Sequence, residues 1–303
     1  MSMKYKLSII VITMNRAKQL VNALQSCFDS NLPGETEFVI VDNASTDNTE
    51  ETVHTLFAQH YYPYKYIKEN ENRGVGGGRN IGYENAEGEF CYFLDDDAII
   101  APECHETFFT LPIAHFEKDK NISSITTRIY DEAWKEDRDV VCSKMKDTEL
   151  PTIFMYLGGS HFLRREYYST PLYIDIKYAF EELIPSIYAI EDGHYNCYID
   201  SVRIIHQPQV NKWVKGSETF FDIASKGDAN ILASKNLVYP VIMRPILYLM
   251  FVLRLLKHFG TKFKWYKLTY KRFKETKKSK APRKVKVATI FSIIKRFGIN
   301  NAF

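Results

Sequence analysis

The stretch EFCYFLDDD, Glu89–Asp97, decides the fold class of this chain. Its first part, Glu89–Leu94, is short and rich in aromatic side chains, which is typical of a buried strand. Three carboxylates, Asp95, Asp96 and Asp97, follow directly. Adjacent carboxylates repel one another and need a cation or access to water. A divalent ion shared with phosphate oxygens meets that need. An acidic turn that caps the next helix is the alternative.

Three similar runs precede this strand, and helical stretches separate them. The predicted strands are Leu7–Ile12, Glu37–Val41, Tyr64–Ile67 and Glu89–Leu94. The predicted helices are Arg16–Ser30, Thr49–His60 and Gly78–Ala86. Alternation of strands and helices indicates right-handed crossovers and an α/β fold, with a parallel sheet flanked by helices.

Polar segments follow all four predicted strands. They are Thr13–Arg16, Asp42–Asp47, Glu69–Arg79 and Asp95–Asp97. Because parallel sheets bind ligands at the carboxyl ends of their strands, these segments are expected to form one ligand-facing edge. Alone, Val41–Thr49 (VDNASTDNT) would be a good N-cap region, and its place on the shared edge favours a ligand.

A glycine-rich stretch, Asn72–Asn80 (NRGVGGGRN), opens the third predicted helix. Glycines let backbone amides approach an anion, and Arg73 and Arg79 are donors suited to phosphate. The spacing matches neither G-x-G-x-x-G nor G-x-x-x-x-G-K-[ST], which argues against dinucleotide-binding and P-loop proteins. A flexible loop with turn glycines is the alternative.

Four of these motifs together resemble those of family 2 glycosyltransferases with the GT-A fold. They are TMNRAKQL (Thr13–Leu20), VDNASTDNT (Val41–Thr49), NRGVGGGRNIG (Asn72–Gly82) and FLDDDA (Phe93–Ala98). The resemblance implies a GT-A sheet, mixed but mostly parallel, that binds a nucleotide-diphosphate sugar. It also implies Mn²⁺ or Mg²⁺ on the diphosphate, held by Asp95 and Asp97, with Asp97 preferred over Asp95 as the direct ligand.

The same resemblance assigns further residues to the nucleotide sugar. These are Thr13, Arg16, Asp42, Asn43, Arg79 and Asp96. Asn43 stands where many members carry a second Asp, so the resemblance leaves the identity of the base open. His206, in RIIHQP, is a candidate third ligand of the metal or diphosphate, and an ordinary buried or capping histidine is its alternative.

The pair Glu191–Asp192 resembles the family element that bears the catalytic base of inverting transfer. Asp192 is the expected base and Glu191 the second choice, because a carboxylate must take the proton of the acceptor hydroxyl. A helix N-cap is the alternative. Upstream, Gly158–Ser160 resembles the acceptor-side segment, and His161 could stack on a sugar ring or pack in the core.

Charge divides the chain into two unequal parts. Residues 241–303 carry 17 Lys and Arg against Glu275 alone, or +16, whereas the first 240 residues carry 23 against 36, or −13. The 45% hydrophobic content describes an ordinary globular chain and excludes collagen-like, disordered and disulfide-scaffold classes. A basic tail on an acidic body suggests contact with an anionic surface, either membrane or nucleic acid.

The tail is expected to be helical and amphipathic. Its apolar positions are Leu255, Phe259, Phe263, Tyr266, Tyr270 and Phe273, followed by a second set at Ile290, Ile293, Ile294 and Phe297. Val238–Leu256 is interrupted by prolines and arginines, so the tail is expected to lie on a membrane without crossing it. A helical domain that packs on the catalytic body is the alternative.

Five cysteines without a CxxC pair and an N-terminus without a secretory apolar core indicate a reducing, cytosolic compartment. We expect a catalytic domain over 1–240, with a nucleotide-sugar half (1–100) and an acceptor half (101–240). A membrane-associating region follows over 241–303, at the inner face of the cytoplasmic membrane.

The expected function is inverting, metal-dependent transfer of a sugar to a glycan or lipid-linked acceptor in cell-surface polysaccharide synthesis. Ala229–Val241 resembles rhamnosyltransferase-like members, which favours dTDP-rhamnose as donor, followed by UDP-sugars. A nucleotidyltransferase and a protein that binds nucleic acid through its tail are the alternatives. The absence of a nucleic-acid motif argues against the latter.

Overall fold

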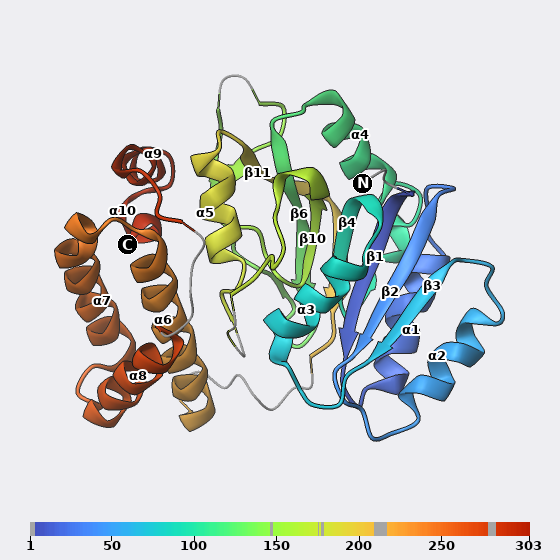
Figure 1. Cartoon of the computed structure of the whole chain (residues 1–303), viewed down its shortest axis with the longest axis horizontal. Coiled ribbons are helices and arrows are strands. Elements are labelled where there is room, and N and C mark those ends of the chain that lie inside the picture. Colours follow the sequence, from blue (N-terminus) through green and yellow to red (C-terminus); the bar gives the residue numbers. More distant parts are fainter. Residues whose placement is uncertain (1–3, 146–147, 175, 177–178, 209–216, 278–282) are drawn as a thin grey trace.

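The computed structural model describes residues 4–145, 148–174, 176, 179–208, 217–277 and 283–303. One twisted mixed sheet runs through the molecule, with helices on both faces and a separate group of helices beyond α5 (Figure 1). The strand order is β3-β2-β1-β4-β10-β6-β11-β9-β8. This arrangement confirms the α/β class and the flanking helices predicted from the sequence.

The first half of the sheet is parallel. It comprises β1 (Tyr5–Thr13), β2 (Thr36–Asp42), β3 (Tyr64–Lys68) and β4 (Gly88–Asp95). The crossover helices are α1 (Ala17–Phe28), α2 (Thr49–Phe57) and α3 (Gly74–Asn85). β1 and β2 are almost wholly buried because helices cover both of their faces, which explains their continuous apolar runs.

The glycine-rich stretch opens α3 as expected, but the helix begins at Gly74, four residues before the predicted start at Gly78, so the glycines of the stretch lie within its first turns. A Cβ on Gly78 would lie 2.7 Å from Ile12 Cγ2, and one on Gly82 would lie 2.4 Å from Ile10 Cγ2. Gly78 and Gly82 therefore let α3 approach β1 closely, which is a packing role.

The second half of the sheet is mixed. Its main strands are β6 (Ile122–Asp131), β10 (Ser160–Arg164) and β11 (Tyr195–His206), and its short ones are β5 (Ala98–Ile100), β7 (Glu136–Asp137), β8 (Cys142–Ser143) and β9 (Thr152–Ile153). The helices are η1 (Pro102–Cys104), α4 (Thr110–Lys118), η2 (Arg165–Tyr167) and α5 (Leu183–Glu191). β10 runs antiparallel between β4 and β6. β5 pairs with the end of β11, which places His206 opposite Ala98.

The C-terminal part is helical. It comprises α6 (Glu218–Val238), η4 (Val241–Met243), α7 (Arg244–Phe259), α8 (Phe263–Thr276), α9 (Val287–Phe297) and α10 (Ile299–Ala302). These helices share a second hydrophobic core, to which α5 and Phe154 also contribute. α6 thus packs with the helices that follow it, although it lies before the boundary expected near residue 240.

The amphipathic face expected for the tail is wrong in its detail. Gly260, with φ +51°, ends α7 and separates it from α8, so there are two helices where the spacing predicted one. Leu255, Phe259 and Phe273 are buried in the second core, whereas Phe263 and Tyr270 are exposed. The helical spacing of these apolar residues therefore arises mainly because several of them pack in the core shared with α6, and only some of them face solvent. Among the described residues, no helix is long and apolar enough to span a bilayer.

Candidate active site

The carboxyl ends of β1, β2 and β4 lie side by side, as the parallel sheet requires. Thr13 pairs with Asp42 across β1 and β2, and Ile12 pairs with Asp95 across β1 and β4. The expected edge of polar residues is therefore present. Asp95–Asp97 ends and follows β4, the last of the parallel strands, which lies between β1 and β10 in the middle of the whole sheet.

Asp95, Asp97 and His206 form a group that can hold a metal ion. One ligand atom from each lies within 4.8 Å of the others, and all three residues are partly exposed. Asp95 ends β4, Asp97 lies in the turn before β5, and His206 ends β11. Two carboxylates and one imidazole are a donor set that fits a divalent cation such as Mn²⁺.

Two side chains that the sequence did not single out, Asp131 and Arg138, fix the orientation of His206. Its Nδ1 lies 2.5 Å from Asp131 Oδ1, and its Nε2 lies 3.3 Å from Asp97 Oδ1. Arg138 fixes Asp131 in turn, with Nε 2.8 Å from Asp131 Oδ2. Burial opposes the charged imidazole, but Asp131 and Asp97 outweigh it and raise the pKa of His206 to about 9. Asp131 thereby orients Nε2 toward the carboxylates.

Asp96 points away from this group toward β1. Its carboxylate accepts hydrogen bonds from Thr13 Oγ1 and Arg16 Nη1, each at 2.8 Å. Arg16 also donates to Asp97 Oδ2 at 2.8 Å. Burial and neighbouring Asp97 raise the pKa of Asp96 to about 6, although Arg16 opposes the shift. Thr13, Arg16 and Asp96 thus form one network beside the candidate metal ligands.

Asp42 and Asn43 lie at the end of β2 and shape the neighbouring part of the edge. Asp42 is buried and accepts from Tyr66 Oη at 2.5 Å and from the Ser45 amide at 2.7 Å. Asn43 accepts from the Arg73 amide at 2.8 Å and donates to Gly74 O at 3.1 Å. The two side chains therefore join the β2 loop to β3 and to the start of α3.

Arg79 joins α3 to three carboxylates. Its Nη1 lies 2.7 Å from both Glu181 and Glu182, and its Nη2 lies 2.9 Å from Asp95 Oδ1. Nη2 also donates to Gly158 O at 2.7 Å. Because Arg79 is buried and both of its terminal nitrogens are engaged, it acts in this structure as a link between α3, β4 and α5. It is not a free donor for a diphosphate.

Glu181 and Glu182 are site residues that the sequence reasoning missed. They immediately precede α5 and bring two buried carboxylates next to Asp95 through Arg79. Burial and Glu181 raise the pKa of Glu182, although Arg79 acts in the opposite direction. The available signal was an adjacent acid pair before an apolar helix, whereas Glu191 and Asp192 were chosen for their resemblance to the family element.

Glu191 and Asp192, expected to provide the base, lie at the opposite end of α5 from Glu181 and Glu182. Asp192 is ion-paired to Arg283 at 2.5 Å, and Glu191 accepts from Thr289 and the Lys286 amide. The nine residues of α5 span about 13 Å, so this pair is well separated from Glu182. These two carboxylates attach the C-terminal segment to α5.

The GGS segment contributes through its backbone. A Cβ on Gly158 would lie 2.0 Å from Glu182 Oε1, and a Cβ on Gly159 would lie 3.1 Å from Asp95 Oδ2. Only small residues therefore leave room for this cluster of charges. His161 is buried and stacks on Phe93 with ring centroids 4.8 Å apart, so it packs in the core and has no free face for a sugar.

Comparison with known proteins assigns the chain to a family. The sequence model of glycosyl transferase family 2 matches residues 8–170, which is more than half of the 303 residues. This chain belongs to glycosyltransferase family 2. The match covers the parallel half of the sheet and the Asp95–Asp97 turn, and it agrees with the resemblance of the four N-terminal motifs.

Curated relatives match over shorter segments. A Campylobacter jejuni enzyme, GalNAc(5)-diNAcBac-PP-undecaprenol beta-1,3-glucosyltransferase, is 35% identical over 92 residues, which are 30% of this chain and 29% of the relative. The Staphylococcus aureus poly(ribitol-phosphate) beta-N-acetylglucosaminyltransferase TarS is 35% identical over 99 residues, 32% of this chain and 17% of the relative. The matched segments thus span less than a third of either relative.

Solved structures share the GT-A architecture. S. aureus TarS 1-349 in complex with UDP-GlcNAc aligns with a TM-score of 0.59 at 17% identity, over 98% of this chain and 89% of that one. The mannosyltransferase PcManGT from Pyrobaculum calidifontis, in complex with GDP-Man and Mn²⁺, aligns with a TM-score of 0.56 at 15% identity, over 99% and 78%. At such identities the likeness supports the fold alone.

Proposed function

We propose that this chain transfers a sugar from a nucleoside-diphosphate sugar to a glycan or lipid-linked acceptor, with inversion at the anomeric carbon. The observation that carries the proposal is the Asp95, Asp97 and His206 group at the carboxyl edge of a family 2 sheet. A divalent cation held there would neutralise charge on the leaving diphosphate. Asp131 and Arg138 would keep His206 in the orientation that binding needs.

The nucleoside would lie beside β1 and β2. Thr13 and Asp42 end these strands and Asn43 follows β2, at the same edge of the sheet as the candidate metal ligands. Arg16 lies between this edge and Asp97, where its cation can meet a phosphate oxygen when a donor enters. Asp96 holds Arg16 and Thr13 in place for that contact.

A UDP-sugar is the donor class that we favour. The TarS structure contains UDP-GlcNAc, and the two curated relatives named above are a glucosyltransferase and an N-acetylglucosaminyltransferase. None of these proteins is named as a rhamnosyltransferase, so dTDP-rhamnose becomes the second choice. The acceptors in the relatives' names, an undecaprenol-linked glycan and poly(ribitol-phosphate), support a lipid-linked or polymeric acceptor of the cell surface.

Glu182 is the residue to which we assign the general base, in place of Asp192. A base must accept the proton of the acceptor hydroxyl as its oxygen attacks the anomeric carbon and the diphosphate leaves from the opposite face. Glu182 is connected through Arg79 to Asp95, and its raised pKa suits proton uptake near neutral pH. Glu181 is its neighbour and the second candidate.

Residues 241–303 are proposed to associate with an anionic membrane at the inner face of the cytoplasmic membrane. Their net charge of +16 supports attraction to acidic lipid, at about 1 kcal/mol for each Lys or Arg near the surface. A lipid-linked acceptor would be met at the same surface. The catalytic part is proposed to comprise 1–240, with the nucleotide-sugar half over 1–100.

The reaction is tested by incubating the protein with individual nucleotide sugars and Mn²⁺. Slow release of free nucleoside diphosphate from one donor, abolished by chelation of the metal, would support the proposed class of reaction. Release of pyrophosphate from a nucleoside triphosphate and a sugar phosphate would instead identify a nucleotidyltransferase.

A further inference from the structure

The outer surface of α7 carries large apolar side chains that no described residue covers. Leu249, Val252, Leu253 and Leu256 are each 49–59% exposed. At 100° per residue these four positions fall within an arc of about 100°, which makes a continuous stripe. Ile242, 76% exposed, lies just before α7. These five residues are called the α7 face below.

This exposure is concentrated in one part of the molecule. Among the described residues, ten of the fifteen exposed large hydrophobic side chains lie beyond residue 240. Figure 1 shows α7 at the edge of the molecule, with α6 between it and α5. The inner side of α7, with Leu247, Phe251 and Leu255, is buried in the second core. α7 is therefore apolar on two sides, and only the inner side packs against other residues that the structure describes.

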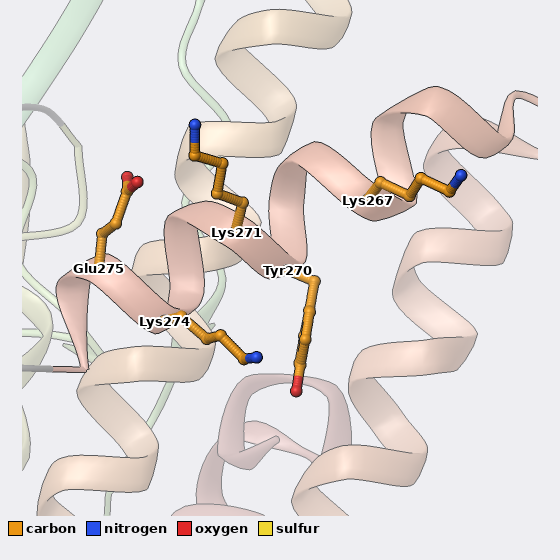
Figure 2. A pocket seen from close by; sticks show the side chains of 5 residues that line it. All are labelled: Lys267, Tyr270, Lys271, Lys274 and Glu275. Atoms are coloured by element: carbon orange, nitrogen blue, oxygen red, sulfur yellow. The ribbon is translucent and has the colours of Figure 1, made fainter.

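Positive charge borders the α7 face. Lys257 is exposed beside Leu253 and Leu256, and Lys262 and Lys264 flank Phe263, which is 72% exposed. In α8, Lys267, Lys271 and Lys274 extend from the helix around a shallow recess that also includes Tyr270 and Glu275 (Figure 2). Glu275 is the sole acidic residue after residue 240. Among these lysines, Lys264 is ion-paired to Glu218 of α6 at 2.6 Å. Apolar side chains among more lysines than acids complement an anionic lipid surface.

We propose that the α7 face, with Phe263, is the surface that inserts into the interface of an anionic bilayer. The inference rests on the membrane association proposed above, and it moves the contact from the buried residues of the predicted tail helix to the outer side of α7. A second copy of the chain fits less well, because an isologous contact would bring Lys257, Lys262 and Lys264 of two molecules together.

The test is co-sedimentation of the full chain with vesicles of phosphatidylcholine and 30% phosphatidylglycerol. L253E/L256E places two acids on the α7 face, and Y61E/V141E makes the same charge change at exposed apolar positions of the catalytic body. The partition coefficient should fall at least tenfold in L253E/L256E and stay within twofold of the wild-type value in Y61E/V141E. Equal binding by both variants, or no binding by the wild type, would overturn the proposal.

Two further measurements separate the possible failures. If light scattering without vesicles shows a dimer that L253E/L256E alone converts to a monomer, the face joins two copies and the lipid proposal is wrong. A monomeric wild type supports it. Calorimetry with UDP and Mn²⁺ should give the same affinity for the wild type and L253E/L256E. If the wild type binds UDP but does not bind vesicles, the lipid inference alone is wrong. If the wild type does not bind UDP, the proposed donor is wrong.

Discussion

The guanidinium of Arg79 lies 2.7 Å from the carboxylate of Glu182, a residue 103 positions later in the chain. This contact joins α3, which packs on the nucleotide half of the sheet, to the start of α5 on the acceptor half. Both side chains are buried, and Asp95 lies on the other side of the same guanidinium. Arg79 thus fixes the position of the candidate base, Glu182, relative to a candidate metal ligand, Asp95.

Arg79→Met should destabilise the protein strongly. It would leave Glu181 and Glu182 buried without their cation, and breaking a buried ion pair by removing one partner costs about 3–5 kcal/mol. Urea unfolding measures the loss. Arg73→Met is the matched control, because the Arg73 ion pairs are largely exposed and should be worth about 1 kcal/mol or less. Equal losses in both variants would contradict the assigned role of Arg79.

Glu182→Gln should abolish most transfer while donor binding persists. The amide keeps the shape of the side chain but cannot accept the acceptor proton, and general-base contributions are about 10²–10⁴-fold. Single-turnover transfer measures the rate, and calorimetry with UDP and Mn²⁺ measures donor binding. Glu181→Gln and Asp192→Asn are the comparisons, and both should be milder. A larger loss in Asp192→Asn would restore the base to the far end of α5.

Glu182 should also make stability depend on pH. Its pKa is raised by burial and by Glu181, against the effect of Arg79, and Tyr173 is a further titratable group near Glu182. A carboxyl whose pKa is higher in the folded than in the unfolded protein binds more protons when folded. Its contribution to stability is therefore lost as pH rises above about 4.3, the usual value for Glu.

Urea unfolding of the wild type and Glu182→Gln between pH 4 and pH 8 tests that sign. The free energy of unfolding of the variant minus that of the wild type should increase with pH, because the amide cannot ionise. A difference that stays constant or decreases would mean that Glu182 is stabilised in its ionised form.

Much of the nucleotide half could be predicted from the sequence, because its strands and helices are set by local patterns. All four predicted strands are present, with ends that shift by up to two residues. The turn after β4 could be identified as a candidate site because three adjacent carboxylates repel one another unless a cation or water stabilises them. His206 remained an open candidate, since only the pairing of β5 with β11 brings it to Asp97.

The acceptor half was less predictable for a physical reason. Two acid pairs, Glu181–Glu182 and Glu191–Asp192, flank the same helix, and the direction in which α5 runs decides which pair reaches the sheet edge. That direction depends on contacts distant in sequence, such as Arg79 with Glu181. In the tail, likewise, a run of apolar residues at helical spacing looks the same whether it packs on α6 or faces solvent.

Gly82→Ala tests the packing role found for the glycines of α3. Alanine favours a helix by about 1 kcal/mol over glycine, but its Cβ would lie 2.4 Å from Ile10 Cγ2 in the buried centre of β1. Overpacking costs about 1–3 kcal/mol, so a net loss of stability is expected. Gly34→Ala is the control, because no atom lies within 4 Å of its added Cβ. Thermal unfolding should show a lower midpoint for Gly82→Ala alone.

The central claim is that Asp95, Asp97 and His206 hold a divalent cation that binds the donor diphosphate. Calorimetric titration with UDP, with and without Mn²⁺, tests it most directly in the wild type, Asp97→Ala, His206→Ala and the exposed-site control Asp137→Ala. The wild type and Asp137→Ala should bind UDP at least tenfold more tightly with Mn²⁺. Asp97→Ala should lose that enhancement, and His206→Ala should lose part of it. Equal enhancement in all four proteins would contradict the metal site.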